Sequence, residues 1–225
     1  MCDGNATARR RDLAEGGSAL ASPVMQTFDV ADLSQPEVYK LTLGIVAPRP
    51  IGWIGTVDRQ GRPNLGPYSF FNAVATNPPV VLYSVAITDG VGKHSLTNAE
   101  ETGEFTASLV SRDIVEAMNQ SAAHLPAGES EFDFAGLTPA PSDIVKAPWV
   151  AEAKAAMECK VQRIITLGNA PIQHGVVFGE IVRFHVADDL LDGTRIRPDR
   201  LDAVGRMGGL TYTGATDLFD LVRPD

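Results

Sequence analysis

Short apolar runs, separated by glycine, proline and polar turns, dominate the sequence from residue 49 to residue 85. Ile51 to Val57 is rich in strand-forming residues and ends at Asp58-Arg59-Gln60-Gly61, where glycine can adopt the positive φ of a tight turn. Asn64 to Tyr68 predicts the return strand. Asn77-Pro78-Pro79 then breaks the chain, and Val80 to Val85 predicts a third strand. This pattern is typical of antiparallel β structure.

Alternation of apolar and polar residues predicts further strands in the second half of the chain. Glu104 to Val110 alternates as a half-buried strand does. Alternation from Met157 to Leu167 places Cys159 on the buried face of a long strand, so we interpret Cys159 as a core residue and not as a nucleophile. In the next strand we expect a core face made of Val176, Phe178, Val182, Phe184 and Val186. The chain is therefore expected to be mostly β, with two or three helices outside the sheet.

Three helices are predicted from their start and stop signals. Leu33 to Leu43 follows the pattern of a short helix, with Ser34 as its N-cap. Ser95 has the character of the N-cap of a helix that ends near Gly103. Ser111 is expected to cap a structural helix that runs to about Ala122.

Residues 124–150 form a long excursion that is rich in proline and has few periodic apolar positions. Loops of this length are uncommon in compact domains unless they are functional. Phe132, Phe134 and Trp149 lie in this segment. Their rings can contact a ligand, or they can simply anchor the loop to the sheet, and the sequence leaves both alternatives open.

Composition limits the class of protein. The chain has 225 residues, 44% of them hydrophobic, which is enough for one sizeable domain. Its net charge of −9 argues against nucleic acid or an anionic membrane surface as a partner, because both need clustered basic charge. No apolar run approaches the length of about 20 residues that a membrane span requires. A cytoplasmic protein is the plain expectation.

The first 24 residues lack aromatic side chains and have only scattered apolar ones, so we predict a disordered extension at 1–24 and a folded domain at 25–225. Cys2 and Cys159 are far apart, and neither a disulfide framework nor a cysteine metal site is indicated. The four histidines are scattered singly and form no spaced metal-ligand set. Neither a dinucleotide-binding glycine motif nor a P-loop is present, and there is no nucleophile elbow.

Two stretches carry candidate chemistry. Phe70 and Phe71 lie between Ser69 and Asn72, and rings beside small polar groups suit a flat ligand with polar edges, although core packing is the commoner role of such rings. The second stretch is Lys93-His94-Ser95 at a predicted helix start. A helix N-terminus favours an anion, and this one adds a cation and a hydroxyl, so a phosphate fits there. An ordinary capped helix with a solvated lysine is the alternative.

The order of these pieces resembles a known family. RPIGWIGTVD, GRPN, SFFNAV and NPPVVLYS follow one another from residue 49, and Lys93-His94-Ser95 with Asn98 and Arg206-Met207-Gly208-Gly209 with Tyr212 come later. Together they resemble the flavin reductase-like branch of the FMN-binding split-barrel proteins, over roughly residues 28–212. The family pattern at residues 93–95 is Lys-Asp-Thr, so His94 is a departure whose role stays open. The resemblance implies an antiparallel, Greek-key-like split β-barrel that forms a homodimer and binds FMN near the subunit interface.

Site residues are carried over by their motif positions. The resemblance implies that FMN contacts come from Arg49, Trp53, Thr56, Ser69, Phe70, Phe71, Asn72, Lys93, His94, Ser95 and Asn98. Contacts to the nicotinamide or the substrate are expected from Trp149, Arg206, Gly208 and Tyr212. The implied activity is hydride transfer from NADH or NADPH to FMN and on to oxygen, free flavin or a small substrate. An electron-transfer flavoprotein and an FMN-binding protein without turnover are the alternatives.

Overall fold

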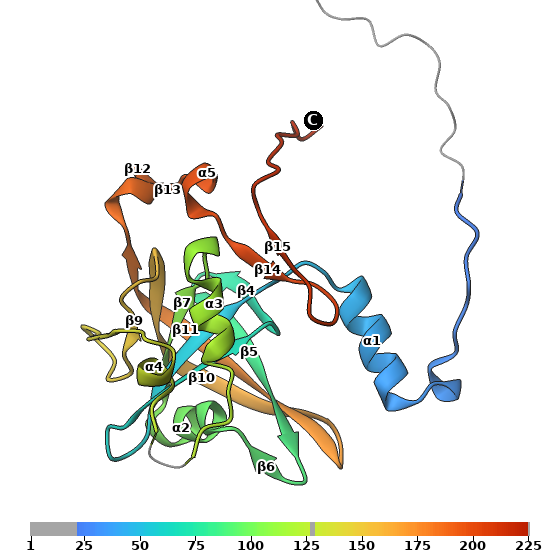
Figure 1. Cartoon of the computed structure of the whole chain (residues 1–225), viewed down its shortest axis with the longest axis horizontal. Coiled ribbons are helices and arrows are strands. Elements are labelled where there is room, and N and C mark those ends of the chain that lie inside the picture. Colours follow the sequence, from blue (N-terminus) through green and yellow to red (C-terminus); the bar gives the residue numbers. More distant parts are fainter. Residues whose placement is uncertain (1–21, 127–128, 225) are drawn as a thin grey trace, which may run out of the picture. The chain divides into compact units, whose positions relative to one another are not determined.

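The computed structural model describes residues 22–126 and 129–224 (Figure 1). The chain divides into two compact units, residues 1–38 and residues 39–225. Residues 1–21 of the predicted extension lie outside the described residues. In the first unit, the 3-10 turn η1 (Val30–Asp32) precedes the start of helix α1 (Gln35–Ile45). The N–H and hydroxyl of Ser34 both bond Glu37 Oε2, at 2.8 and 2.5 Å, which marks the helix start at the predicted position.

One eight-stranded antiparallel sheet forms most of the second unit. The strand order is β3-β2-β7-β10-β11-β5-β4, and the short strand β6 pairs with β5. The bounds are β2 (Gly52–Val57), β3 (Pro63–Tyr68), β4 (Phe71–Thr76), β5 (Pro79–Thr88), β6 (Val91–Gly92), β7 (Glu104–Leu109), β10 (Ala155–Asn169) and β11 (Ile172–Val186). The predicted mostly β, antiparallel class is confirmed. Strand β4 was not predicted, because Phe71 and Asn72 were interpreted only as a ligand-binding cluster.

Small elements complete the second unit. A three-stranded sheet joins β1 (Arg49–Pro50) to β14 (Val204–Arg206) and β15 (Tyr212–Gly214). Two further sheets each consist of a pair of two-residue strands: β8 (Pro139–Ala140) with β9 (Trp149–Val150), and β12 (Leu191–Asp192) with β13 (Arg195–Ile196). The helices are α2 (His94–Thr102), α3 (Val115–Gln120), α4 (Glu131–Phe134) and α5 (Pro198–Leu201), and 3-10 turns occupy η2 (Arg112–Ile114) and η3 (Asp188–Leu190). Among the described residues, no helix combines the length and the apolar character that a membrane crossing needs.

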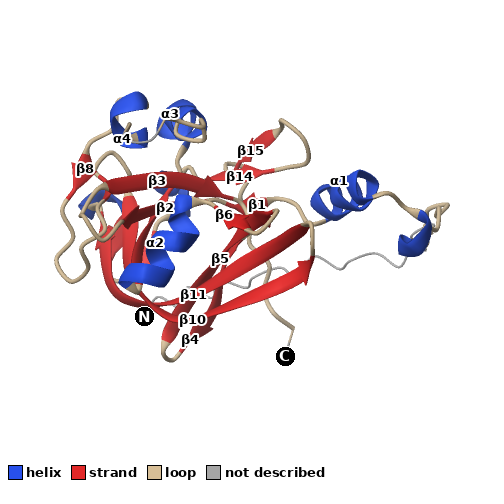
Figure 2. Ribbon diagram, turned by 90° about the horizontal axis from the view of Figure 1, so that it is seen from below, coloured by secondary structure: helices blue, strands red, loops and turns tan. Residues whose placement is uncertain are grey.

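The large sheet curls around its own core. Tyr68 on β3 and Tyr83 on β5 come from the first and the second-last strand of this order, yet their ring centroids are 5.5 Å apart. Helix α2 lies between these two sides of the curled sheet (Figure 2). The enclosed core is made of Ile54, Val81, Tyr83, Val85, Leu96, Ala99, Phe105, Ala107, Cys159 and Val177. The buried position predicted for Cys159 is therefore confirmed.

A second core lies on the outer side of β2 and β3, where α3 and α4 pack on β3 (Figure 2), while β9 covers β7 and β2. Strand β7 is consequently buried on both faces, and the half-buried strand predicted at this position is wrong. The hydroxyl of Thr106 donates to the carbonyl oxygen of Pro148 at 2.6 Å, and Ser108 Oγ accepts from the Val150 N–H at 3.1 Å. Polar residues that alternation assigned to solvent are thus satisfied by the covering segment.

The core face predicted for β11 is also wrong in part. Val177 is fully buried in the barrel core, whereas Phe184 is 60% exposed. The pairing of β10 with β11 shifts register at Glu158/Cys159 and at Val161/Arg163, and such bulges change which side chains face the core. Simple alternation along a 15-residue strand cannot follow these shifts.

Candidate functional site

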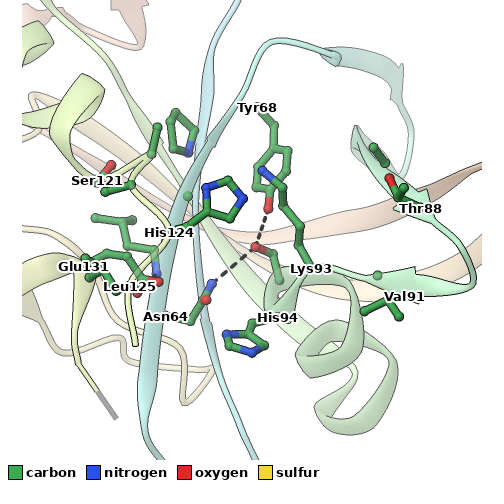
Figure 3. Close-up of a pocket in the computed structure, with 18 residues that line it drawn as sticks. Asn64, Tyr68, Thr88, Val91, Lys93, His94, Ser121, His124, Leu125 and Glu131 are labelled. Atoms are coloured by element: carbon green, nitrogen blue, oxygen red, sulfur yellow. Dashed lines mark hydrogen bonds between the residues drawn. The ribbon is translucent and has the colours of Figure 1, made fainter. Parts of the chain in front are cut away.

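A cavity of about 440 Å³ lies at the start of α2 (Figure 3). Strand β3 forms one wall, the end of β5 and the turn to α2 form another, and residues 121–125 form a third. Lys93, His94 and Ser95, predicted from sequence as a phosphate site, all line this cavity. Its volume lies within the range of small-molecule sites, which is roughly 300–1,000 Å³.

The backbone at this helix start suits an anion. The N-cap is Lys93, with an extended backbone, and not Ser95 as predicted. No hydrogen bond from the N–H of His94 or Ser95 reaches another residue in the described part of the chain. Because the first N–H groups of a helix have no intrahelical partner, they can bind a ligand oxygen here. The nine-residue helix adds the positive end of its dipole.

The hydroxyl of Ser95 is held from two sides. It lies 2.6 Å from the hydroxyl of Tyr68 and accepts a hydrogen bond from Asn64 Nδ2 at 3.3 Å. Burial raises the pKa of Tyr68 to about 12, so its phenol stays protonated and neutral at physiological pH. Thr56 Oγ1 accepts from the side-chain amides of Asn64 and Asn98, at 3.3 and 3.1 Å. Thr56 and Asn98, predicted as FMN contacts, are therefore buried behind Ser95 and connected to it through Asn64.

His124 faces the helix start from the third wall. Figure 3 shows its ring directed toward Tyr68 and Lys93. Three side chains that can carry positive charge, those of Lys93, His94 and His124, thus line one cavity. Its single carboxylate among the described residues, Glu131, accepts a hydrogen bond from the Leu65 N–H at 3.2 Å. Sequence reasoning missed Asn64, Tyr68 and His124 as site residues, because only the fold brings these three segments together.

A second cavity of about 320 Å³ adjoins the first, and Pro67 and Ala122 line both. It contains Arg49, Ser69, Arg206 and Tyr212 of the predicted site residues. Arg49 is buried and donates to the carbonyl oxygens of Leu43, Val46 and Met207 at 2.7, 2.5 and 2.9 Å, and to Ser69 Oγ at 3.4 Å. Burial lowers the pKa of the Arg49 guanidinium from its ordinary value. The three carbonyl bonds fix Arg49 as part of the cavity wall.

Arg206 and Tyr212 lie at the edge of this cavity and bind each other. The Arg206 guanidinium carbon lies 4.4 Å from the centre of the Tyr212 ring, and Arg206 also donates to the Tyr212 hydroxyl. The Tyr212 hydroxyl donates to Asn119 Oδ1 at 3.4 Å. Gly208 does not line the cavity; a Cβ added to it would lie 3.6 Å from the Cα of Gly44. Its backbone packs closely on α1.

Other predicted site residues lie outside both cavities. Trp53 is fully buried and donates from Nε1 to Ser121 Oγ at 2.9 Å, so it supports the third wall from behind. Phe70 stacks on His174 with ring centroids 5.5 Å apart, Phe71 packs over Gly52, and Asn72 is exposed on the edge strand β4. Trp149 stacks on His185 at 4.8 Å. The structure thus brings together the helix start and the Arg49 group, but not the aromatic cluster.

Glu158, which sequence reasoning did not single out, is a fully buried carboxylate beside Trp149 and His185. It accepts from the N–H groups of Asp143, Ile144 and Val145 at 2.9, 2.7 and 2.9 Å, and from His185 Nε2 at 2.7 Å. Burial opposes its ionisation, but these hydrogen bonds outweigh burial and lower the pKa of Glu158 to about 2. Asp143, Glu158 and His185 lie close enough to share a metal ion, yet Glu158 is saturated by these bonds and Asp143 pairs with Arg183 at 2.8 Å. The cluster is best explained as the contact that holds the 142–150 segment on β10, and we call Glu158 with its four hydrogen-bond donors the Glu158 clasp.

Comparison with known proteins places this geometry in a family. The family described as "Flavin reductase like domain" matches residues 46–205. Nitrilotriacetate monooxygenase component B from Bacillus cereus superposes with a TM-score of 0.86 and 37% identity, over 89% of this chain and 100% of that chain. The 2-nitrobenzoate 2-nitroreductase NbaA of Pseudomonas fluorescens gives 0.81 and 31%, over 88% and 96%. A split-barrel-domain structure from Shewanella frigidimarina gives 0.75 and 27%, over 86% and 96%, which confirms the predicted fold. The chain belongs to the flavin reductase-like family.

Proposed function

We propose that this protein is an FMN-dependent oxidoreductase that takes hydride from a nicotinamide nucleotide. The observation that supports this most directly is the cavity at the start of α2, where Lys93, free helix N–H groups and His124 converge. This donor set matches a phosphate monoester, because helix N-termini and cationic side chains are the usual partners of phosphate. Membership in the flavin reductase-like family supports flavin as the molecule that carries it.

The two adjoining cavities suit an elongated ligand with one anionic end. We assign the phosphate of FMN to Lys93 and the helix N–H groups, and the flavin ring to the side of Pro67, toward Arg49 and Ser69. His94 and His124 lie beside the proposed phosphate position and add hydrogen-bond donors. Tyr68 and Asn64 hold Ser95, and so keep the first turn of α2 in place. FMN, when bound, supplies the capacity to accept and donate hydride.

The residues of the second cavity act on the second reactant in this proposal. Arg206 and Tyr212 lie at its edge and hold each other through the cation–π contact, so a nicotinamide nucleotide can be oriented by one preformed pair. Arg49, fixed by three carbonyl oxygens, provides a constant positive charge beside the proposed ring position. The protein needs no acid–base pair for hydride transfer, because the flavin carries the redox chemistry. A homodimer, implied by the family resemblance, is part of the proposal, and the exposed Phe184 supports an apolar contact between copies.

Comparing FMN with riboflavin tests the phosphate assignment. Lys93→Ala should weaken FMN roughly ten- to a hundredfold, because a charge-assisted hydrogen bond contributes about 1.5–3 kcal/mol. Riboflavin, which lacks the phosphate, should bind with nearly unchanged affinity. Lys160→Ala is the matched control, since Lys160 is exposed on β10 and lines neither cavity. Equal losses for FMN and riboflavin would remove the phosphate from this position.

Anaerobic stopped-flow mixing tests the reaction. The flavin-loaded protein should lose its oxidised flavin absorbance on mixing with NADH or NADPH, faster than free FMN does under the same conditions. If neither nucleotide accelerates this reduction while FMN still binds tightly, the reductase proposal fails and an electron carrier reduced by another protein takes its place.

A further inference from the structure

An apolar groove of about 570 Å³ lies between the small sheet of β1, β14 and β15 and the end of the large sheet where β10 begins and β11 ends. Its apolar lining includes Ile51, Phe71, Leu109, Met157, Phe184 and Val204. Phe184 is 60% exposed, so the groove opens to the surface. Large exposed apolar surfaces of this kind usually mark a contact with another chain or ligand. Arg49 and Ile51 also line the second cavity of the proposed flavin site, but the main part of the groove is separate from it.

The C-terminal tail (residues 216–224) carries exposed apolar side chains of the kind that an apolar groove can bind. Figure 1 shows that the chain runs on beyond β15 without joining another element. Four large apolar side chains within five residues are exposed by 49, 78, 85 and 96%: Leu218, Phe219, Leu221 and Val222. A single exposed apolar residue needs no explanation, but a cluster as dense as this one does.

We propose that the C-terminal tail of one copy docks into the apolar groove of a second copy. The spacing of Leu218, Leu221 and Val222 places them on one face of a helical turn, the pattern of a segment that docks in a groove. Asp217 and Asp220 precede and interrupt the apolar positions, with the spacing of an N-cap and an acidic first-turn residue. The tail can therefore form one capped turn when its apolar face is covered.

The charges at the edge of the groove also favour binding of the C-terminal tail. The 195–200 segment contributes Ile196 to the groove and carries three arginines beside it. Arg197 and Arg200 share Asp199, at 3.1 and 3.7 Å, and Arg195 is exposed with no ion pair in the described ranges. Three cations around one carboxylate leave positive charge at the edge of the groove, which complements the two aspartates of the tail.

Chain direction favours a second copy over the tail's own groove. Ala215 lines the groove, and its N–H donates to the carbonyl oxygen of Ala203 at 2.9 Å, so the chain is fixed at the groove wall where the tail begins. A tail that filled its own groove would have to reverse direction at once. Residues 216–222 contain no glycine and no proline, the two residues that interrupt a regular backbone most strongly. Exchange between two copies covers both grooves symmetrically and needs no reversal.

Mixed cross-linking tests the exchange directly. Two variants are prepared in a Cys2→Ser background, one with Phe219→Cys and the other with Phe184→Cys, and they are mixed under mild oxidation. Because each chain then carries one engineered thiol and the buried Cys159, a disulfide between the two variants can form only between copies. We expect the mixed disulfide dimer. The control replaces Phe184→Cys by Leu210→Cys, since Leu210 is 92% exposed but lies outside the groove, and it should cross-link far less.

Self-association gives a second, independent measurement. Deletion of residues 216–225, or Phe219→Ser with Leu221→Ser, should raise the dimer dissociation constant at least tenfold in sedimentation equilibrium. Leu210→Ser should leave it unchanged. Absence of the mixed disulfide, or tail variants that associate as tightly as the full chain, would overturn the proposal. Neither measurement depends on flavin, so its outcome is distinct from that of the FMN titrations.

Discussion

The hydroxyl of Tyr68, on the edge strand β3, lies 2.6 Å from the hydroxyl of Ser95, in the first turn of α2. This contact joins two of the three walls of the cavity that we assign to the FMN phosphate. In the described part of the sheet β3 pairs with β2 alone, and the end of β3 is held against the barrel core both by the packing of Tyr68 on Tyr83 and by this contact with α2. The position of one hydroxyl pair therefore connects barrel closure to the geometry of the site.

Removal of that hydroxyl should loosen the site more than the fold. Tyr68→Phe keeps the ring in the core and leaves Ser95 bonded to Asn64, so we expect a loss of about 0.5–1.5 kcal/mol in the free energy of unfolding. The affinity for FMN should fall as well, because Ser95 loses one of its two anchors. Thermal unfolding and FMN titration measure the two effects. Unchanged values for both would mean that the contact contributes nothing to either.

Two glycines, one against the barrel core and one in open space on α1, give a matched test of how tightly the core is packed. A Cβ at Gly179 would lie 2.3 Å from the ring of Phe105, so Gly179→Ala should destabilise the protein by about 1–3 kcal/mol through overpacking. Gly44 is in α1 with nothing within 4 Å of its added Cβ, so Gly44→Ala should stabilise by about 0.5–1 kcal/mol. Chemical denaturation of both variants checks the opposite signs. A stable Gly179→Ala would show that the Phe105 ring can move aside.

The strands of the central hairpin were predictable from sequence because their signals are local. Residues 51–57 and 64–68 contain the apolar pattern of β2 and β3, and the turn at residues 58–61 separates them. The structure differs from the predicted strands by one residue at each start. The edge strand β4 was missed because its exposed residues carry no burial pattern. Its partner is the following strand β5, so only pairing in the folded sheet defines it.

The site was predictable only where one segment carries it. Lys93-His94-Ser95 was found because cation, ring and hydroxyl are consecutive at a helix start. The role of Ser95 was wrong in detail, because its hydroxyl turns inward to Tyr68 instead of capping the helix. Asn64 and His124 come from other parts of the chain, and their approach to Ser95 depends on how the sheet curls. Long-range packing of this kind leaves no local pattern in one sequence.

The Glu158 clasp predicts a specific loss of stability in acid. The pKa of Glu158 is lowered from 4.5 to about 2 in the folded protein, so the folded state binds this proton less readily than the unfolded state does. The contribution of Glu158 to the free energy of unfolding is fully present above pH 4.5 and is lost as the pH falls toward 2. One pKa unit corresponds to about 1.4 kcal/mol, so this shift sets an upper value of roughly 3.5 kcal/mol for the contribution of Glu158.

Glu158→Gln should remove that part of the pH dependence. The variant should be less stable than the parent at pH 7, and the difference should shrink as the pH falls below 4.5. Denaturant unfolding at several pH values measures it. Glu180→Gln is the control, because Glu180 is on the neighbouring strand β11 and its carboxylate bonds a side chain, Gln162 Nε2, and not the backbone of the 142–150 segment. A difference between Glu158→Gln and parent that is constant with pH would contradict the clasp.

The last prediction separates the roles of the two cavities. If Arg206 orients the nicotinamide nucleotide, Arg206→Gln should lower kcat/KM for NADH or NADPH by roughly ten- to a hundredfold, because the variant loses one charge-assisted hydrogen bond. The affinity for FMN should change by much less, because Arg206 lies in the second cavity and does not line the first.

Arg163→Gln, an exposed position on β10, is the control. Tyr212→Phe should have a smaller effect, since the ring that stacks with Arg206 remains. Stopped-flow reduction at several nucleotide concentrations, together with FMN titration, measures both quantities. Equal losses of FMN and nucleotide affinity in Arg206→Gln would instead place Arg206 on the flavin itself.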